Sequence, residues 1–221
     1  MSNRPRSEIT EELHELGIIL DRREIFLGRD NDNDDSCDTD YKSAMKFIKN
    51  MRLLQRFDGQ HLPILIHQIN HGGDWCCGMA IYDTIASSES HITLVCHGAA
   101  MSMGSIIPQA ADLRIMMPNA TFMIHSGDTG DIVGTFKQGV SWTDFNKSCN
   151  EKMLNIYASK CQNAPRFKNK GPKAIKTAIS KKMDTKEDWI IDAKEAVEYG
   201  FADAVLGDKG YENLNIILNK T

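Results

Sequence analysis

The chain has 221 residues, which is the size of one α/β domain and more than a disulfide-stapled mini-protein needs. Hydrophobic residues make up 41% of it and charged residues 25%, and this composition is typical of a globular domain rather than of a disordered or membrane-spanning chain. The net charge of −4 does not attract a polyanion, so nucleic acid is not expected as the main partner.

The N-terminal residues are polar, and no run of about 18 apolar residues occurs anywhere in the chain. The six cysteines form no C-x-x-C pair, and the adjacent Cys76 and Cys77 have an unfavourable geometry for a disulfide. Reduced thiols are typical of the cytoplasm. We therefore expect a cytoplasmic protein that makes no contact with a membrane.

Residues 16–27 are predicted as a pair of strands, and the stretch 30–40 that follows contains six Asp residues. It opens with the spacing of an EF-hand calcium loop, but Asp stands at the sixth position in place of Gly and Tyr at the twelfth in place of Glu. We interpret the stretch as a solvated loop with no metal, in which Asp38 or Asp40 caps the next helix.

The rest of the chain alternates short apolar runs with amphipathic segments. Strands are predicted at 62–66, 91–96, 113–117, 121–125 and 200–206, and helices at 41–57, 75–87, 145–157 and 173–182. The first two of these strands end in small-residue turns, Gly72-Gly73 and Gly98-Ala99-Ala100, and each turn leads into a helix. This alternation is the pattern of an α/β fold.

Three features of the chain point to chemistry on a carbonyl group. Backbone N–H groups between a strand and a helix can stabilise negative charge on an oxygen. Ser102 follows the second turn at the start of a helix, where it is either an exposed nucleophile or an ordinary N-cap. His125 ends an apolar strand before a polar, glycine-containing segment, which is a suitable place for a base. Spacing does not choose an orienting carboxylate among the 30 Asp and Glu residues.

These residues resemble the proteolytic subunit of the ATP-dependent Clp protease, the ClpP family. The resemblance rests on four ordered segments: the Gly-Gly loop and helix at 72–84, Gly-Ala-Ala-Met-Ser-Met-Gly at 98–104, the histidine segment 114–125 and the closing motif 188–200. It covers most of residues 16–206.

The resemblance implies a serine endopeptidase that hydrolyses peptide bonds of unfolded proteins inside an oligomeric chamber. Ser102 would be the nucleophile, His125 its base and Asp188 the third member of the triad, and the N–H groups of Gly72 and Met103 would form the oxyanion hole. It also implies a homo-oligomer of heptameric rings, which can stack, and a Clp-type ATPase as partner. Neither a cofactor nor a metal is expected.

The same resemblance implies the fold and the domain organisation. The fold would be ClpP- or crotonase-like, with repeated β-β-α units and a protruding helical handle at about 126–187. Residues 1–15 would be an axial or a disordered segment, and residues 16–221 one peptidase domain. The stretch 160–182 holds eight Lys or Arg and no acidic residue, and we interpret it as a solvated surface rather than a binding site for an acidic partner.

Several residues near the expected substrate groove depart from the family pattern. Ser126-Gly127 replaces Gln-Pro after the histidine, Asn70-His71 replaces Ser-Pro before the paired glycines, and Met101 replaces a small residue. These departures leave the cleavage preference open. Three alternatives also stay open: a phage-type capsid maturation protease with the same triad, a catalytically silent ring subunit, and a crotonase-like acyl-CoA enzyme, which needs no such triad.

Overall fold

The structure is a computed structural model that describes residues 5–28, 37–57, 61–127 and 134–218. The calcium-like opening of the acidic loop lies outside these residues. Asp40, at the end of that loop, accepts a hydrogen bond from the Ser43 N–H (2.7 Å) and caps the helix that follows. Asp38 instead binds the ring and the backbone N–H of His71, so of the two predicted caps Asp40 is the one used.

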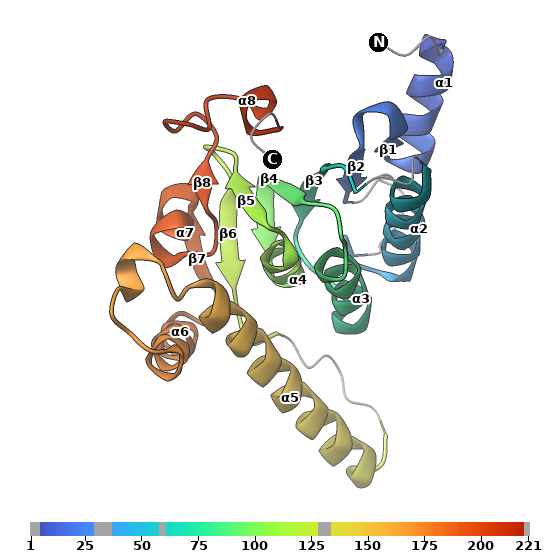
Figure 1. The fold of residues 1–221 in the computed structure, drawn as a ribbon. Helices are drawn as coiled ribbons and strands as arrows, with labels where there is room; N and C mark the ends of the chain where they lie inside the picture. Colours follow the sequence, from blue (N-terminus) through green and yellow to red (C-terminus); the bar gives the residue numbers. More distant parts are fainter. Residues whose placement is uncertain (1–4, 29–36, 58–60, 128–133, 219–221) are drawn as a thin grey trace.

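A mixed sheet forms the centre of the described structure and confirms the α/β class (Figure 1). Its strands are β1 (Ile18–Ile19), β2 (Glu24–Leu27), β3 (Ile64–Asn70), β4 (Ile92–Met101), β5 (Leu113–Met116), β6 (Thr121–Ile124), β7 (Trp189–Asp192) and β8 (Ala204–Val205). The order is β1-β2-β3-β4-β5-β8, and β6 pairs with both β4 and β7. Among the strands of the described residues, the β1–β2 and β6–β7 pairs are antiparallel and the others are parallel.

Helices α2 (Tyr41–Phe57), α3 (Trp75–Ala86) and α4 (Met103–Ile106) pack their apolar faces into the main core. Helix α2 has the predicted bounds, and its buried side chains include Phe47 and Met51. Strand β3 is buried on both faces, because Ile64 and Ile66 belong to the main core and Leu65 to a second core, which Ile217 helps to close. Residues 62 and 63 belong to the predicted strand 62–66 but lie before β3, which begins at Ile64. The Arg23 side chain donates hydrogen bonds to their carbonyl oxygens instead.

The prediction that the second buried strand ends in a turn at Gly98-Ala99-Ala100 is wrong. Strand β4 continues through these residues to Met101. Its residues 93–96 pair with β5, and its residues 99–101 pair with β6. Gly98 lies between the two pairings with φ 59°, a backbone conformation that glycine adopts at little cost. The small residues therefore allow the strand to change partners instead of ending it.

The C-terminal prediction is wrong in part as well. Only Ala204–Val205 of the predicted strand 200–206 is extended, and β7 and helix α7 (Ala193–Tyr199) precede it. Arg114 of β5 fixes this region: its guanidinium binds both carboxylate oxygens of Asp203 and the Gly200 carbonyl. Arg114 is buried, and this charge-assisted network holds the segment against β5. Gly200 ends α7 in the left-handed conformation, so the residues directly after it form a helix cap rather than a strand.

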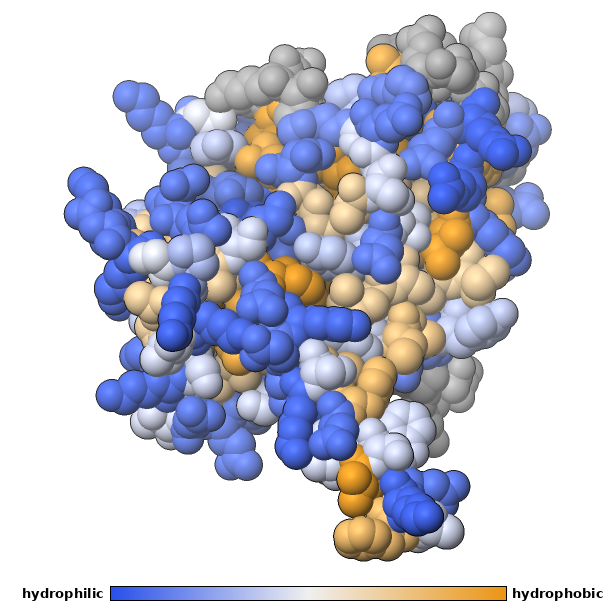
Figure 2. Space-filling view, turned by 60° about the horizontal axis from the view of Figure 1, so that its bottom comes forward, coloured by the Kyte–Doolittle hydropathy of each residue, from blue (hydrophilic) through white to orange (hydrophobic). Residues whose placement is uncertain are grey.

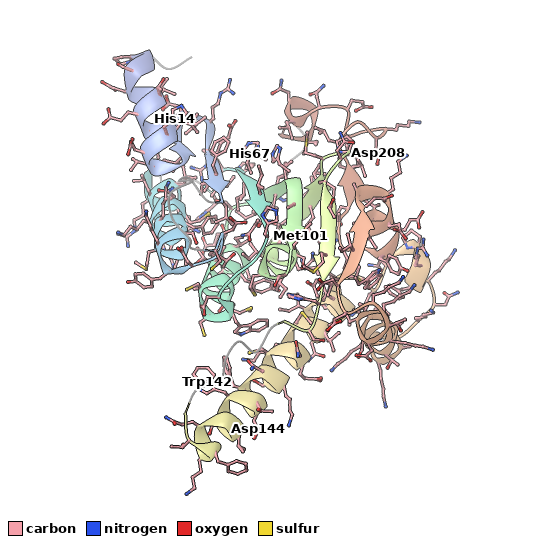
Figure 3. The ribbon with its side chains drawn as sticks, turned by 180° about the vertical axis from the view of Figure 1, so that it is seen from behind. His14, His67, Met101, Trp142, Asp144 and Asp208 are labelled. Atoms are coloured by element: carbon pink, nitrogen blue, oxygen red, sulfur yellow. The ribbon has the colours of Figure 1, made fainter. Side chains whose placement is uncertain are left out.

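Helix α5 (Phe136–Lys160) is longer than predicted and leaves the body of the molecule diagonally (Figure 1). Its N-terminal half exposes Phe136, Val140 and Trp142, and apolar surface is visible at the projecting end in Figure 2. Thr135 begins the helix with a capping box to Gln138. Figure 3 shows Trp142 and Asp144 on this projecting half, away from Met101 in the body.

Helix α6 (Pro172–Lys186) carries much of the basic stretch 160–182. Part of that stretch is neutralised within the chain, because Lys176 pairs with Glu151, and Arg166 with Glu195 and Glu198. These pairs favour the interpretation of a solvated surface.

Helix α8 (Leu214–Leu218) lies near the C-terminus, and α1 (Arg6–Glu11) with a π-helical turn (Glu12–Leu16) begins the described chain. The segment predicted as axial or disordered is thus helical from residue 6, and an axial position stays a prediction. No helix among the described residues is long and apolar enough to cross a membrane.

Candidate active site

Three neighbouring strands bring Ser102, His125 and Asp188 together. In the register of β6 with β7, Ile124 lies opposite Trp189, so the next residues outward, His125 and Asp188, meet at the same edge of the sheet. Met101 of β4 lies beside Met123 of β6, which places Ser102 next to them. Residues that are 86 positions apart in the chain, numbers 102 and 188, therefore share one site.

The side chains make the contacts that a serine nucleophile needs. His125 Nε2 lies 2.7 Å from Ser102 Oγ, within the distance for proton transfer. His125 Nδ1 lies 3.4 Å from Asp188 Oδ1, and the Asp188 side chain is 59% exposed. The Ser–His contact is thus tight, whereas the His–Asp contact is long and open to water.

The backbone at Ser102 is held in an unusual conformation, with φ 51° and ψ −123°. Such a conformation costs a non-glycine residue about 1–3 kcal/mol. It persists because the Ser102 N–H donates to the Met123 carbonyl (3.1 Å), and the Ser102 carbonyl accepts from the Ser105 N–H (2.9 Å). The Ser102 side chain makes no capping bond to α4. The N-cap alternative therefore does not describe the use of its hydroxyl, which faces His125.

The Gly72 loop lies directly against this serine. A Cβ atom on Gly72 would lie 2.6 Å from Ser102 Cβ, and Gly72 has φ 111°. The Gly72 N–H donates to the side-chain oxygen of Asn70 (2.7 Å). Asn70 is fully buried and also bonds to Thr39. Met103 is the first residue of α4, where backbone N–H groups have no partner within the helix.

A cavity of about 850 Å³ opens beside Ser102 and His125. One wall comes from the inner half of α5, with Phe145, Cys149 and Met153. Burial raises the pKa of the Cys149 thiol, so this wall stays neutral. Ser126 and Gly127 border the opening, so residues that depart from the family pattern line the cavity.

The sequence predictions do not include the α5 wall, the buried side chain of Asn70, or the hydrogen-bonded pair Ser105 and Tyr157. The wall was detectable as a stripe, because positions 142, 145, 149, 153 and 157 are three or four residues apart. Nothing in the spacing relates Asn70 or Tyr157 to Ser102. Among the described residues, no group of three or more His, Cys, Asp or Glu is arranged to hold a metal ion.

Comparison with known proteins gives a consistent result. The family model described as Clp protease matches residues 9–209. The chain is 31% identical over 190 residues to ATP-dependent Clp protease proteolytic subunit 1 of Rhodococcus jostii, which covers 85% of this chain and 76% of that protein. Identity is 28% over 200 residues to the subunit 1 of Corynebacterium glutamicum, covering 89% and 85%. It is 31% over 144 residues to the proteolytic subunit of Deinococcus radiodurans, covering 64% and 63%.

The α/β fold and these matches define the class of the protein as a serine-type endopeptidase, a hydrolase. The chain belongs to the Clp protease family, and at about 30% identity over most of its length it is a divergent relative of ClpP. Family membership favours the peptidase over the crotonase-like alternative.

Proposed function

We propose that the chain hydrolyses peptide bonds of unfolded proteins with Ser102 as nucleophile, His125 as general base and Asp188 as the group that orients the imidazole. The observation that carries this proposal is the 2.7 Å contact between His125 Nε2 and Ser102 Oγ beside the cavity. The order Ser, His, Asp along neighbouring strand ends supports it.

In this mechanism the cavity holds the side chain that precedes the scissile bond. His125 takes the Ser102 proton as Oγ attacks the peptide carbonyl carbon, and then protonates the leaving amine. Water attacks the resulting acyl-enzyme by the same route and releases the second product. Asp188 stabilises the imidazolium through Nδ1, and closure of the 3.4 Å contact would strengthen this effect.

The N–H groups of Gly72 and Met103 are proposed as the donors to the oxyanion. The Gly72 N–H donates to the side-chain oxygen of Asn70. An oxyanion carries more charge than an amide oxygen and is the stronger acceptor. Substrate would therefore compete with the Asn70 side chain for this N–H as the tetrahedral intermediate forms.

A ring-shaped homo-oligomer and a Clp-type ATPase belong to the proposal as well. The exposed apolar residues on the projecting half of α5 support its role as a handle through which copies meet. The names of the related proteins include the words "ATP-dependent" and "subunit", which supports both an ATPase partner and assembly. The repeated β-β-α units and the cytoplasmic location stay predictions.

A fluorophosphonate probe tests the nucleophile. Wild-type protein should be labelled at Ser102, as located by peptide mapping, and Ser102→Ala should not be labelled. In the Asp188→Asn variant, both probe labelling and peptide hydrolysis should be about 10⁴-fold slower than in wild type, because the imidazole loses its orienting charge. Ser126→Ala is the matched control, since this serine borders the same cavity, and it should label normally. An unlabelled wild-type protein, or one labelled elsewhere, would refute the proposed mechanism and leave the silent-subunit alternative.

The requirement for a Clp-type ATPase is tested separately, with casein as an unfolded substrate. We expect degradation only when a Clp ATPase and ATP are supplied. Efficient cleavage of a folded capsid or scaffold protein without ATP would favour the maturation protease instead.

A further inference from the structure

A buried chain of hydrogen bonds connects helix α5 to the turn that carries Ser102. Ser105 Oγ lies 2.6 Å from the Ser102 carbonyl oxygen and 2.6 Å from the Tyr157 hydroxyl oxygen. Ser105 and Tyr157 are both fully buried. Both also line the cavity beside Ser102.

The direction of these hydrogen bonds follows from the chemistry of the groups. A carbonyl oxygen only accepts, and the Ser105 hydroxyl has one proton. Ser105 therefore donates to Ser102 and accepts from Tyr157. Burial raises the pKa of the Tyr157 hydroxyl above its usual value, so this group remains a protonated donor across the working pH range. Successive donors polarise one another, which strengthens the bond that reaches Ser102.

We propose that Tyr157 and Ser105 are positioning residues that hold the disfavoured backbone of Ser102 and so keep its Oγ within reach of His125. This inference rests on the proposed function for its catalytic meaning. The Ser102 carbonyl accepts two hydrogen bonds in this turn, one from the Ser105 N–H and one from the Ser105 hydroxyl. The second donor is oriented from α5, the same helix that forms a wall of the cavity.

The role of the Tyr157 hydroxyl can be separated from that of its ring. The ring packs edge-on against Phe201, with centroids 5.3 Å apart, and Phe at position 157 would keep this packing. Tyr199 provides a matched control, because it is also buried and its ring stacks on the same Phe201. A merely structural role for a buried tyrosine predicts similar effects of Tyr157→Phe and Tyr199→Phe.

The experiment measures the second-order rate of fluorophosphonate labelling in a double-mutant cycle. Tyr157→Phe and Ser105→Ala should each label about tenfold more slowly, the size expected for one lost hydrogen bond in a chain. The double variant should be no slower than Ser105→Ala, because Tyr157 acts only through Ser105. Peptide hydrolysis should show a lower kcat with an unchanged KM, and Tyr199→Phe should stay within twofold of wild type.

Two results would overturn the inference: labelling by Tyr157→Phe at the wild-type rate, or losses that multiply in the double variant. If the wild-type protein is not labelled at all, the proposed function fails, and amide hydrogen exchange in residues 102–106 decides the positioning role independently. Faster exchange in Tyr157→Phe than in Tyr199→Phe would support it, and equal exchange would reject it.

Discussion

At the residue scale, the site depends on the close approach of Gly72 to Ser102. The backbone of Gly72 has φ 111°, and a Cβ atom there would lie 2.6 Å from Ser102 Cβ. Residue 72 must therefore lack a side chain for two reasons, its conformation and the volume available. Gly98 has φ 59° with open space around the Cβ position, so it shares only the first constraint.

The variant Gly72→Ala should reduce fluorophosphonate labelling by at least 10²-fold, the loss typical of a displaced oxyanion donor. The inserted methyl group would push the loop and Ser102 apart. Labelling kinetics measure this effect, and thermal denaturation shows whether the variant is folded. Gly98→Ala is the control for conformational strain alone and should label faster than Gly72→Ala. Equal losses in the two variants would show that crowding at Ser102 is unimportant.

The sequence predicts the residue types of the site, because the serine, the histidine and the aspartate each belong to one of the ordered motifs. Ser102, His125 and Asp188 were predicted from those motifs, and the structure brings their side chains within 2.7 and 3.4 Å of one another. Their catalytic roles stay a proposal. In the sequence Asn70 is only a departure from the family pattern, since its bond to the Gly72 N–H depends on how the strand end turns.

At the scale of elements, Arg114 ties β5 to the segment that follows α7. It binds Asp203 through two nitrogens and the Gly200 carbonyl through a third. These contacts hold the C-terminal part of the chain, which includes β8, against the sheet. The carboxylate and the carbonyl would lose their partner if the guanidinium were removed.

Arg114→Leu should lower the free energy of unfolding by about 3 kcal/mol, the cost of breaking a buried ion pair on one side. Urea denaturation followed by circular dichroism measures this change. Arg166→Leu is the control, because Arg166 pairs with Glu198 at the exposed surface, and such pairs contribute little. An equal loss in both variants would contradict the structural role of Arg114.

At the scale of the whole molecule, the projecting half of α5 exposes large apolar side chains. Phe136 is 87% exposed and Val140 46% exposed, which is unusual for large apolar side chains on a helix that leaves the body. The inner half of the same helix forms the cavity wall. One helix thus serves the site at one end and presents an apolar surface at the other.

Native mass spectrometry should find the wild-type protein as an oligomer and the double variant Phe136→Ser, Val140→Ser as a smaller species. Loss of apolar contact area between copies is the physical reason. Asp144→Ser, on the same half of α5 (Figure 3), is the control and should keep the wild-type mass. A monomeric wild-type protein would remove the ring from the proposal, and an unchanged mass in the double variant would remove α5 from the interface.

The sequence alone predicts the α/β class, helix α2, most of the other helices and strands, and the residue types of the site. These depend on local patterns: a periodicity of 3.6 or 2, or a motif at fixed spacing. It failed where a distant partner decides the outcome. Strand β4, for example, continues through its small residues because β6 pairs with it.

Which groups share one site depends on how the strands and helices pack in three dimensions. Three strand ends place residues from distant parts of the chain within hydrogen-bond or ion-pair distance, and α5 contributes both the cavity wall and the Tyr157 hydroxyl. The contact between the Tyr157 hydroxyl and Ser105 has no sequence signature, because a short local pattern carries no information about separations of 50 or more residues. The sequence therefore determined which chemical groups are available, and the pairing of β4, β6 and β7 decided their arrangement.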